Sequence, residues 1–306
     1  MDDALQVGVI PGAVMADLTA VVACEQVQPA RPLSFESSSD PSGIVPFLKW
    51  AGGKRWLASH MRSVIGAIRG RYIEPFVGSG AVFFAVQPSS ALLSDSNREL
   101  IYTYRAIKSQ WRAVGRHLAG HHALHCKEHY YSVRRSTPST FAARAAKFIY
   151  LNRTCWNGLY RVNLNGQFNV PIGTKTAVIM DSDDFGAIAA ILSNAEIIHA
   201  DYEYSISQAV AGDVVFCDPP YTVRHKHNGF IKYNEDLFSW ADQVRLRNLL
   251  LMARNRGVRV FVTNADHQSI RELYSAQFDI HEFERFSSIG GARAIRGSYP
   301  ELLIVG

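Results

Sequence analysis

The chain has 306 residues, of which 47% are hydrophobic and 19% charged, and its formal net charge is +5. This balance is typical of one or two globular domains with a sizeable core, and it excludes a collagen-like or wholly disordered chain. No run of about 18 apolar residues occurs and no two cysteines form a CxxC pair, which excludes a membrane-spanning helix and a zinc ribbon and predicts a cytoplasmic location.

The first 45 residues are predicted to form a flexible N-terminal extension. The apolar stretch 18–24 is similar to part of a signal peptide, but the chain begins Met-Asp-Asp and lacks the basic segment that such a peptide needs. Residues 29–43 are rich in Pro and Ser, a composition typical of a flexible connector. We assign this extension no catalytic role.

From residue 71 onward, predicted strands alternate with predicted helices. The strand at Tyr72 and Ile73 leads into a glycine-containing turn, 74–80, and an apolar helix begins at Ala81. The alternation predicts an α/β fold with a Rossmann-like, doubly wound, mostly parallel sheet. Helical spacing dominates residues 100–150, further strands are predicted at 91–95, 196–199, 213–217 and 258–263, and a C-terminal antiparallel hairpin at 278–286 and 301–305.

The positive charge is concentrated in one segment of this chain. Between Arg98 and Lys175 there are 13 Lys and Arg but only two Glu, whereas the remainder has 19 basic and 25 acidic residues. Such an excess inside a neutral-to-acidic scaffold favours a segment that binds a polyanion, with a solvated helical face as the alternative. We expect residues 98–179 to form a separate lobe that is mainly helical.

Within this lobe, residues 161–170 are predicted to form a hairpin of two short strands around Asn165-Gly166. A two-stranded ribbon fits the major groove of DNA, and the arginine at 161 suits the two acceptors of guanine. A phosphate contact or salt bridge is the alternative for Arg161.

Four histidines in the same lobe, His117, His121, His125 and His129, recur every four residues. A single helix would place them on one face, as a metal site requires. Gly120 weakens a helix at this point, so a DNA-facing or solvated surface is the preferred interpretation and no metal is expected.

The turn at 74–80 and the acid at the end of the next strand suggest a nucleoside site. Glycines let the backbone approach a ligand closely, and Asp95 is placed to hold a ribose diol. The spacing matches neither the full dinucleotide fingerprint nor a P-loop, which favours a nucleoside without a held pyrophosphate. An ordinary turn, with Asp95 as a helix cap, is the alternative.

The sequence Asp218-Pro219-Pro220-Tyr221 follows a predicted buried strand. A doubly wound sheet delivers such a segment to its carboxyl end, where these folds bind ligands. The prolines fix the backbone and leave the carbonyls of residues 218 and 219 available as acceptors. A proline-rich turn with a packed tyrosine is the alternative.

Four blocks of the sequence resemble the Dam-type DNA adenine-N6 methyltransferases. They are residues 46–54 (PFLKWAGGK), 72–80, 151–171 and 218–221, and together they are specific, covering about residues 46–305. The resemblance implies a methyltransferase domain at 46–97 and 180–306 and a target-recognition domain at 98–179. It also implies S-adenosylmethionine as cofactor, double-stranded DNA as partner, base flipping, GATC as the recognised sequence, no metal and a monomeric enzyme.

The resemblance assigns roles to individual residues. Asp218 and Pro219 would accept the amino hydrogens of adenine, and Tyr221 would stack on the flipped base. Trp156 would wedge into the duplex, with core packing as its alternative. The methyl donor would be bound by Trp50, Ala51, Gly52, Gly53, Lys54, Phe76, Gly78, Gly80, Asp95, Asp201, Tyr202 and Asp218, and DNA by Lys49, Trp156, Asn157, Leu159, Arg161 and Pro171.

Three other functions stay open at this point. The same chemistry on a different sequence would suit a restriction-modification or phage enzyme, and Thr174-Lys175 stands where the family often has an Arg-aromatic pair. Methylation of protein glutamine uses a related motif that usually begins with Asn rather than with Asp218. Binding without catalysis is the third, although no core residue of the motifs is missing.

Overall fold

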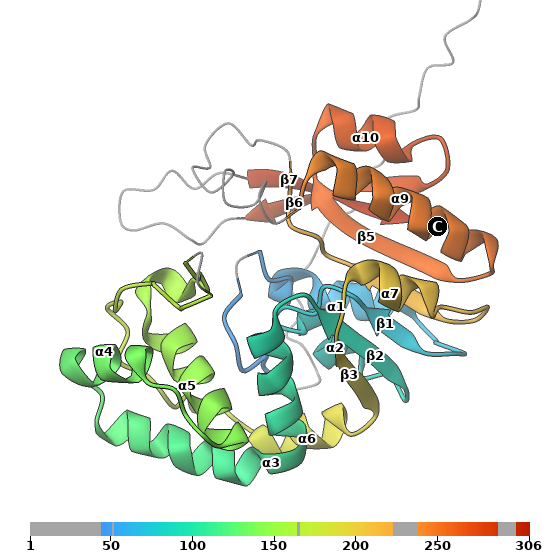
Figure 1. The fold of residues 1–306 in the computed structure, drawn as a ribbon. Helices are drawn as coiled ribbons and strands as arrows, with labels where there is room; N and C mark the ends of the chain where they lie inside the picture. Colours follow the sequence, from blue (N-terminus) through green and yellow to red (C-terminus); the bar gives the residue numbers. More distant parts are fainter. Residues whose placement is uncertain (1–43, 51, 164–165, 223–237, 287–297) are drawn as a thin grey trace, which may run out of the picture. The chain divides into compact units, whose positions relative to one another are not determined.

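The computed structural model describes residues 44–50, 52–163, 166–222, 238–286 and 298–306, and these form a seven-stranded sheet with helices around it (Figure 1). The strands are β1 (Tyr72–Glu74), β2 (Ala91–Asp95), β3 (Ala195–His199), β4 (Val214–Cys217), β5 (Arg259–Ala265), β6 (Asp279–Phe286) and β7 (Ser298–Val305). Their order in the sheet is β3-β2-β1-β4-β5-β7-β6. Strands β1 to β5 are parallel, whereas β7 is antiparallel to both neighbours, β5 and β6.

Helices cover both faces of this sheet. They are α1 (Arg55–Ile65), α2 (Ala81–Val86), α3 (Arg98–Ala123), α4 (Lys127–Arg135), α5 (Phe141–Thr154), the 3₁₀ turn η1 (Trp156–Gly158), α6 (Phe185–Leu192), α7 (Tyr202–Ser207), α9 (Trp240–Asn255) and α10 (Gln268–Tyr274). None of them combines the length and the apolar character that crossing a bilayer requires.

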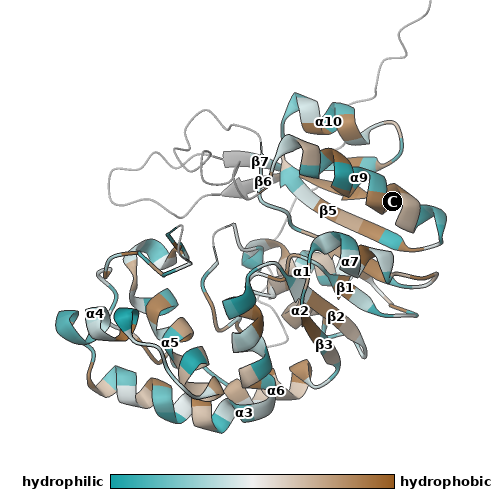
Figure 2. Cartoon of the chain, viewed as in Figure 1, coloured by the Kyte–Doolittle hydropathy of each residue, from teal (hydrophilic) through white to brown (hydrophobic). Residues whose placement is uncertain are grey.

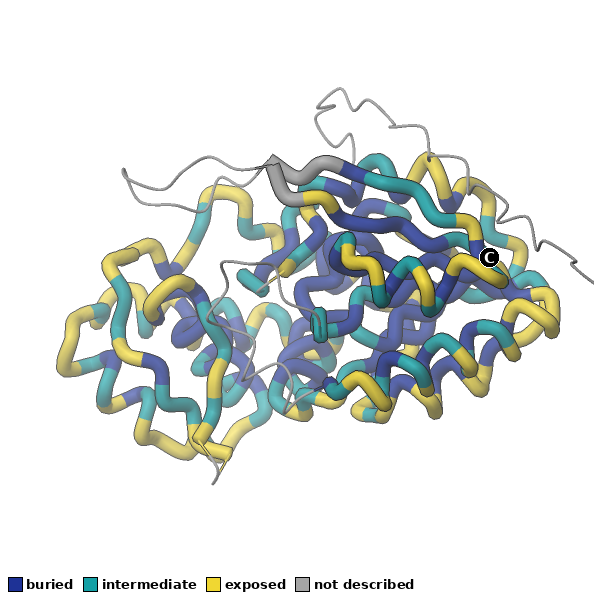
Figure 3. The backbone as a smooth tube through the Cα atoms, turned by 90° about the horizontal axis from the view of Figure 1, so that it is seen from above, coloured by how far each residue is buried: buried dark blue, intermediate teal, exposed yellow. Residues whose placement is uncertain are grey.

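Side chains of the strands alternate between two hydrophobic clusters, one on each face. In β4, Val214 and Phe216 join the cluster that includes α1, α2 and α3, while Val215 and Cys217 join the cluster that includes α7, α9 and α10. Successive strand residues point to opposite faces, so one strand supplies both cores. Because both faces are covered, the inner strands β1, β2, β4 and β5 consist mostly of buried residues. Figure 2 shows β2 and β3 mostly in brown, the hydrophobic colour, and Figure 3 shows buried backbone (dark blue) in the interior with exposed backbone (yellow) around it.

The strand order creates a switch point between β1 and β4. From β1 the chain moves outward through β2 to β3 and then returns to β4 on the other side of β1. Sheets of this kind bind ligands outside the carboxyl ends of their strands at such a point. The turn at 74–80 follows β1 and the segment 218–221 follows β4, so the fold places both sequence motifs there.

The doubly wound sheet and the C-terminal hairpin predicted from the sequence are confirmed. Strand β2 has the predicted bounds, and β3, β4 and β6 differ from prediction by one residue. Strand β7 begins three residues before the predicted position. The predicted extension lies almost wholly outside the described residues.

Helix α3 begins on the sheet and ends in the basic segment. It has a kink at Gln110, where φ is −138°. Before the kink, Arg105 and Lys108 donate hydrogen bonds to the backbone carbonyls of Ile197 and Ala195 in β3, each at 2.7 Å. Two of the basic side chains that suggested a polyanion-binding segment therefore bind the sheet.

The histidines at 117–129 do not share one helix, so the arrangement that a metal site on a single helical face would require is not formed. Helix α3 ends at Ala123 and α4 begins at Lys127, which leaves His125 between them. His121 and His129 lie 3.1 Å apart through ring nitrogens, and His121 stacks on Tyr150 at 4.9 Å between ring centres. Within the described part of the chain, no group of three or more His, Cys, Asp or Glu is arranged to hold a metal ion.

The hairpin predicted at 161–170 is present as a short pairing. Val162 and Phe168 form an isolated antiparallel bridge. Backbone hydrogen bonds from Asn163 to Gln167 (2.8 Å) and from Asn169 to Arg161 (3.1 Å) flank it. The tip at 164–165 lies outside the described residues.

Candidate active site

Acidic side chains gather at the carboxyl ends of the central strands. Glu74 ends β1, Asp95 ends β2, and Asp218 follows β4 directly. Glu301 reaches the same edge from β7: because this strand is antiparallel, its early residues lie where β5 ends, and Glu301 pairs with Ala265, the last residue of β5. The candidate site is built on this edge.

Among the described residues, the partners of Asp218 contact one of its two carboxylate oxygens. Lys54 Nζ lies 2.8 Å from Oδ1, and the hydroxyl of Thr263 donates a hydrogen bond to the same oxygen at 2.7 Å. Among the residues that the structure describes, no donor contacts Oδ2. Burial raises the pKa of Asp218, and the nearby lysine opposes that rise. The carboxylate is therefore fixed in place with one oxygen still able to accept.

Lys54 is a buried cation at the centre of this edge. Its side chain is only 3% exposed. The ammonium donates to the carbonyl of Gly52 at 2.9 Å and lies 3.5 Å from Glu301 Oε2 and 4.9 Å from the centre of the Tyr221 ring. A buried charge is costly unless it is paired, so this lysine ties together the groups around it.

The turn after β1 brings together Trp50, Gly78 and Asp95. Gly78 has a φ of +46°, and a Cβ there would lie 2.7 Å from Trp50 Cδ1, so the close approach requires glycine. Its N–H donates to Asp95 Oδ2 at 3.1 Å, while the N–H of Asn97 donates to Oδ1 at 2.9 Å. Burial raises the pKa of Asp95 to about 6. Gly80, with a φ of +66°, ends the turn at the start of α2.

Phe76 and Tyr202 form a stacked pair beside this turn, with ring centres 5.3 Å apart. Arg245 lies over the Tyr202 ring at 4.6 Å and forms an ion pair of 2.7 Å with Asp201. Asp201 also caps α7 by accepting a hydrogen bond from the N–H of Glu203. The structure thus joins the two aromatic residues, whereas the carboxylate of Asp201 is bound to Arg245 at an exposed helix end. Ala51 lies outside the described residues.

Lys49 is fixed by the fully buried side chain of Asn152. The amide of Asn152 accepts from the Lys49 N–H at 2.9 Å and donates to the Lys49 carbonyl at 2.8 Å. It also donates to the carbonyl of Gly158 at 3.4 Å, next to Leu159. Burial, and secondly the neighbouring Lys175, lower the pKa of Lys49 to about 8. Two sequence blocks about a hundred positions apart therefore meet at this residue.

A surface turn presents Trp156 beside Asn157. The side chain of Trp156 is 51% exposed, which contradicts the core-packing alternative. Asn157 has a φ of +55°, in the left-handed region that few residues other than glycine adopt. The N–H of Trp156 donates to the Pro171 carbonyl at 2.9 Å. A large apolar ring on a fixed turn is thus available for contact with a partner.

Arg161 lies on the hairpin and is exposed to solvent. Its Nε donates a hydrogen bond to Asn169 Oδ1 on the opposite side of the pairing, at 2.9 Å. No carboxylate of the described residues forms an ion pair with it, which argues against a salt bridge as its main role. Its charge remains available to an anionic partner.

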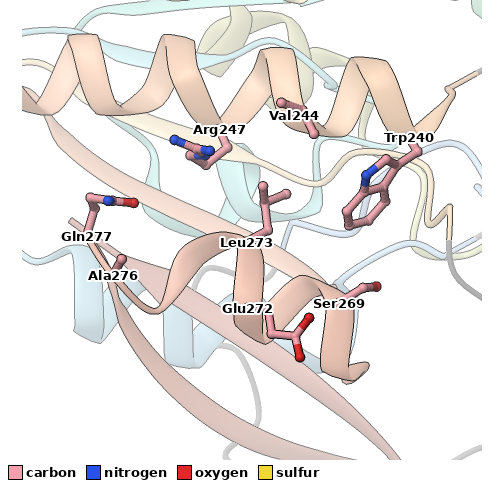
Figure 4. Close-up of a pocket in the computed structure, with 8 residues that line it drawn as sticks. All are labelled: Trp240, Val244, Arg247, Ser269, Glu272, Leu273, Ala276 and Gln277. Carbon is pink, nitrogen blue, oxygen red and sulfur yellow. The ribbon is translucent and has the colours of Figure 1, made fainter. Parts of the chain in front are cut away.

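A groove between α9 and α10 is separate from this network (Figure 4). It shares no residue with the groups around Asp218 or with the predicted DNA contacts. Its lining consists of Trp240, Val244, Arg247, Ser269, Glu272, Leu273, Ala276 and Gln277. We assign it no part in the chemistry at the sheet edge.

Comparison with known proteins identifies the family. The model for the D12 class of N6 adenine-specific DNA methyltransferases matches residues 50–289, well over half of the chain. The chain belongs to this class. It is therefore an adenine-specific DNA methyltransferase whose substrate is DNA and whose methyl donor is S-adenosylmethionine, as the sequence predicted. Membership of this class excludes the alternative function, methylation of protein glutamine.

Individual relatives agree with this assignment. The methyltransferase is 35% identical over 268 residues to the Type II methyltransferase M1.LlaDCHI of Lactococcus lactis subsp. cremoris, covering 85% of this chain and 94% of that one. It is 34% identical over 245 residues to the Type II methyltransferase M.MjaIII of Methanocaldococcus jannaschii, covering 72% and 84%. The DNA adenine methylase of Escherichia coli K12 is 33% identical over 256 residues, covering 81% and 91%.

The residues around the turn fit the methyl donor of this class. Gly78 and Gly80 lie in positive-φ conformations where an added Cβ would lie 2.7 Å from Trp50 and 2.8 Å from Tyr104, so the turn is shaped by the absence of side chains. Each oxygen of Asp95 accepts one backbone N–H, and an ionised carboxylate has about four acceptor sites, which leaves capacity for ribose hydroxyls. Both features suit a nucleoside.

Sequence reasoning missed three members of this site: Thr263, Glu301 and Glu74. Thr263 and Glu301 are polar residues that directly adjoin apolar runs, 260–262 in β5 and 302–305 in β7, which was the available signal. Glu74 lies in the glycine-containing turn at 74–80, but the sequence pattern indicated no role for it. The structure shows it buried, with the hydroxyl of Tyr72 donating to Oε2 at 2.9 Å, and burial raises its pKa well above the ordinary value.

Proposed function

We propose that the methyltransferase modifies the adenine of GATC in duplex DNA, as a monomer, after rotating the base out of the helix. The observation that carries the catalytic part is the half-occupied carboxylate of Asp218. Lys54 and Thr263 both contact Oδ1, and Oδ2, which no donor of the described residues contacts, is left to accept from a substrate. An amino group suits this oxygen, because it is uncharged and has two hydrogens that it can donate in hydrogen bonds.

Adenine N6 is a poor nucleophile because its lone pair is delocalised into the ring. In the proposed complex, Asp218 Oδ2 accepts one amino hydrogen and the carbonyl of Pro219 accepts the other. These two acceptors favour a pyramidal nitrogen, whose lone pair points out of the plane of the ring and is no longer delocalised into it. Fixed acceptors of this kind stabilise the developing charge without having to reorganise during the reaction.

When bound, S-adenosylmethionine would supply a methyl group activated by its positive sulfur, and N6 would lose one proton on accepting that group. Asp218 Oδ2 is the acceptor placed nearest to that proton in the proposed complex. Burial raises the pKa of this carboxyl, which strengthens it as a base. Lys54 keeps the carboxylate oriented throughout.

Tyr221 supports the base outside the helix. The target amine is inaccessible in a stacked duplex, so the enzyme needs an aromatic or apolar surface for the extruded base. Tyr221 follows Asp218 after two prolines, its ring faces the ammonium of Lys54, and it is partly exposed. Trp156 is assigned to the gap that the base leaves in the duplex, with Asn157 next to the opened pair.

The donor is assigned to Trp50, Gly52, Gly53, Phe76, Gly78, Gly80, Asp95 and Tyr202. The contacts of Lys54 favour a different role from the one implied by family resemblance. Its ammonium is engaged by Asp218, Gly52 and Glu301, so we assign it to holding the catalytic carboxylate. The bond between Asp201 and Arg245 likewise supports a structural role for Asp201 at α7.

Recognition of the sequence is assigned to residues 98–179 together with Lys49. The clamp between Lys49 and Asn152 supports this, because it joins the first block to the segment carrying Leu159 and Arg161. Lys49, Leu159, Arg161 and Pro171 are assigned to reading the bases. A second candidate keeps the chemistry but changes the sequence read. The names of the Type II relatives and the Thr174-Lys175 departure favour it as the alternative.

Transfer of labelled methyl groups to two duplexes tests the proposed sequence. One duplex contains GATC and the other has the same bases in scrambled order. Transfer to the first alone supports GATC. Equal transfer to both, or transfer to neither while mixed genomic DNA is methylated, would replace GATC with another sequence.

Replacing Asp218 with Asn tests the catalytic assignment. In one orientation the NH₂ group of the amide faces the donors Lys54 and Thr263, and in the other it faces the adenine amine. Either way, a hydrogen-bond donor of the amide meets another donor and one acceptor is lost. We expect single-turnover transfer to fall about 100- to 1000-fold, with little change in DNA affinity. Asp279→Asn, an exposed position on β6, is the matched control. Retention of most of the transfer rate in Asp218→Asn would remove this residue from the chemistry.

A further inference from the structure

Glu301 is a buried acid that neither the family's motif blocks nor the proposed chemistry uses. It is 4% exposed and lies on β7, 80 positions after Tyr221. The Tyr221 hydroxyl donates to Glu301 Oε2 at 2.9 Å, and Lys54 Nζ lies 3.5 Å from the same oxygen. One carboxylate oxygen thus contacts both residues that surround the catalytic aspartate.

We infer that Glu301 is a positioning residue, which holds the ring of Tyr221 through its hydroxyl in the orientation that receives the flipped adenine. This inference rests on the proposed function. A tyrosine that serves only as a stacking surface needs no hydroxyl, since the face of the ring makes the contact. Here the hydroxyl is anchored to a buried acceptor, and such an anchor fixes the rotation of the ring about its bonds to the backbone.

The topology explains why this anchor comes from β7. Parallel strands present their carboxyl ends to the site, whereas β7 presents its beginning. Glu301 is paired with Ala265 of β5 and with Phe283 of β6, so its backbone is held on both sides. Tyr221 follows β4 and is not itself part of a strand, so β7 supplies a fixed support for its ring.

A hydrogen bond to a charged acceptor is shorter and stronger than one between neutral groups. Burial of Glu301 strengthens it further, because water does not compete for the hydroxyl. The cation of Lys54 offsets part of the cost of burying this carboxylate. The three side chains therefore form one unit, and the loss of Glu301 releases the ring without removing it.

The test compares Glu301→Ala, Glu301→Gln, Tyr221→Phe and the double variant Tyr221→Phe/Glu301→Ala. Each is assayed by single-turnover methylation of duplex DNA and by the fluorescence of 2-aminopurine at the target position, which reports unstacking of that base. Thermal unfolding is recorded for each. Glu282→Gln on β6, a half-exposed acid that pairs with Arg271, is the matched control.

We expect Glu301→Ala and Tyr221→Phe each to lower the transfer rate about 10- to 100-fold, with a changed 2-aminopurine signal. The double variant is expected to lose no more than the worse single variant, because both remove the same bond. Glu301→Gln keeps an acceptor oxygen and is expected to recover most of the rate. Its unfolding temperature and that of the control are expected to match the unchanged enzyme.

Three results would overturn the inference: losses that multiply in the double variant, a Gln variant as impaired as Ala, or rates that fall only in step with unfolding temperature. An Ala variant as active as the Glu282→Gln control would do the same. Failure of the proposed function appears differently. In that case the unchanged enzyme does not methylate adenine, or Asp218→Asn remains active.

Discussion

At the scale of single residues, the site is defined by which carboxylate oxygens already accept hydrogen bonds from the protein. Two donors share Oδ1 of Asp218, and each oxygen of Asp95 carries one backbone N–H. The sequence does not reveal this, because Asp218 is the same residue whichever of its two oxygens is free to accept a hydrogen bond. The chemistry proposed for the site follows from the oxygen that the protein leaves open.

Lys49 gives a prediction at this scale. Its pKa of about 8 means that the free enzyme loses this charge as pH rises through 8. DNA favours the charged form, so binding above that pH requires uptake of a proton, and affinity should fall by at most about tenfold per pH unit. Titration of a fluorescent GATC duplex between pH 7 and pH 9.5 measures the midpoint.

Lys175→Ala is the matched variant for Lys49, because Lys175 is the second cause of the lowered pKa after burial. Removing it should move the midpoint to higher pH, whatever it does to affinity at pH 7. An unchanged midpoint in this variant would show that another group produces the pH dependence.

At the scale of elements, α4 joins the interior of the basic segment to its hairpin. One end is held by the contact between His121 and His129. Farther along the helix, the Tyr130 hydroxyl donates to the Val170 carbonyl at 2.9 Å and Arg134 donates to the same carbonyl at 3.2 Å. Changes at the histidines can therefore reach the strand that carries Asn169.

This arrangement predicts sensitivity to acid. Burial, followed by the charges of His129 and His117, lowers the pKa of His121 to about 4. An unfolded histidine titrates near 6.5, so between these values the unfolded chain binds a proton that the folded chain does not. The contribution of His121 to the free energy of unfolding should therefore decrease as pH falls from about 6.5 to about 4, opposite in sign to that of Asp95 with its raised pKa. Urea unfolding at several pH values measures this.

His121→Phe keeps a ring against Tyr150 but does not titrate, so we expect this variant to lose less stability than the unchanged enzyme as the pH falls from about 6.5 to about 4. His117→Gln removes only the smallest of the three causes of the lowered pKa of His121, so this variant should keep most of the dependence of the unchanged enzyme. Identical curves for all three proteins would assign the acid sensitivity to other groups.

At the scale of the whole molecule, positive charge serves two purposes that the sequence does not separate. Arg105 and Lys108 bind carbonyls of β3, and Arg153 is fully buried with hydrogen bonds to Phe47 and Val178. Arg105 and Lys108 hold the basic segment onto the sheet, and Arg153 ties it to Phe47 before α1. The net charge of that segment therefore overstates what faces DNA.

Salt dependence of DNA binding separates the two purposes. Replacing Arg105 and Lys108 with Ala should lower the unfolding temperature and leave the slope of log affinity against log salt unchanged. Lys175→Ala should reduce the magnitude of that slope by about one. A reduced slope in the Arg105/Lys108 variant would mean that these side chains leave the sheet to contact phosphates.

Much of the fold was predictable because its signals are local. Apolar strands ended by Asp95 or Asp218 mark the sheet edge, and glycine marks the turn between β1 and α2. The parts that escaped prediction depend on distant pairings: Tyr221 with Glu301, Lys49 with Asn152, and Asp201 with Arg245. The break between α3 and α4 was missed because four-residue spacing of histidines continues across it.

The position of β7 has a consequence for how the enzyme is made. This strand is synthesised last of the seven, yet it lies between β5 and β6 and carries Glu301 to the site. During translation, β5 and β6 are made first, and neither can pair with β7 until that strand has been synthesised. Folding of this half of the sheet therefore waits for the final strand, and a nascent chain that already displays Asp218 and Tyr221 is not yet a working enzyme.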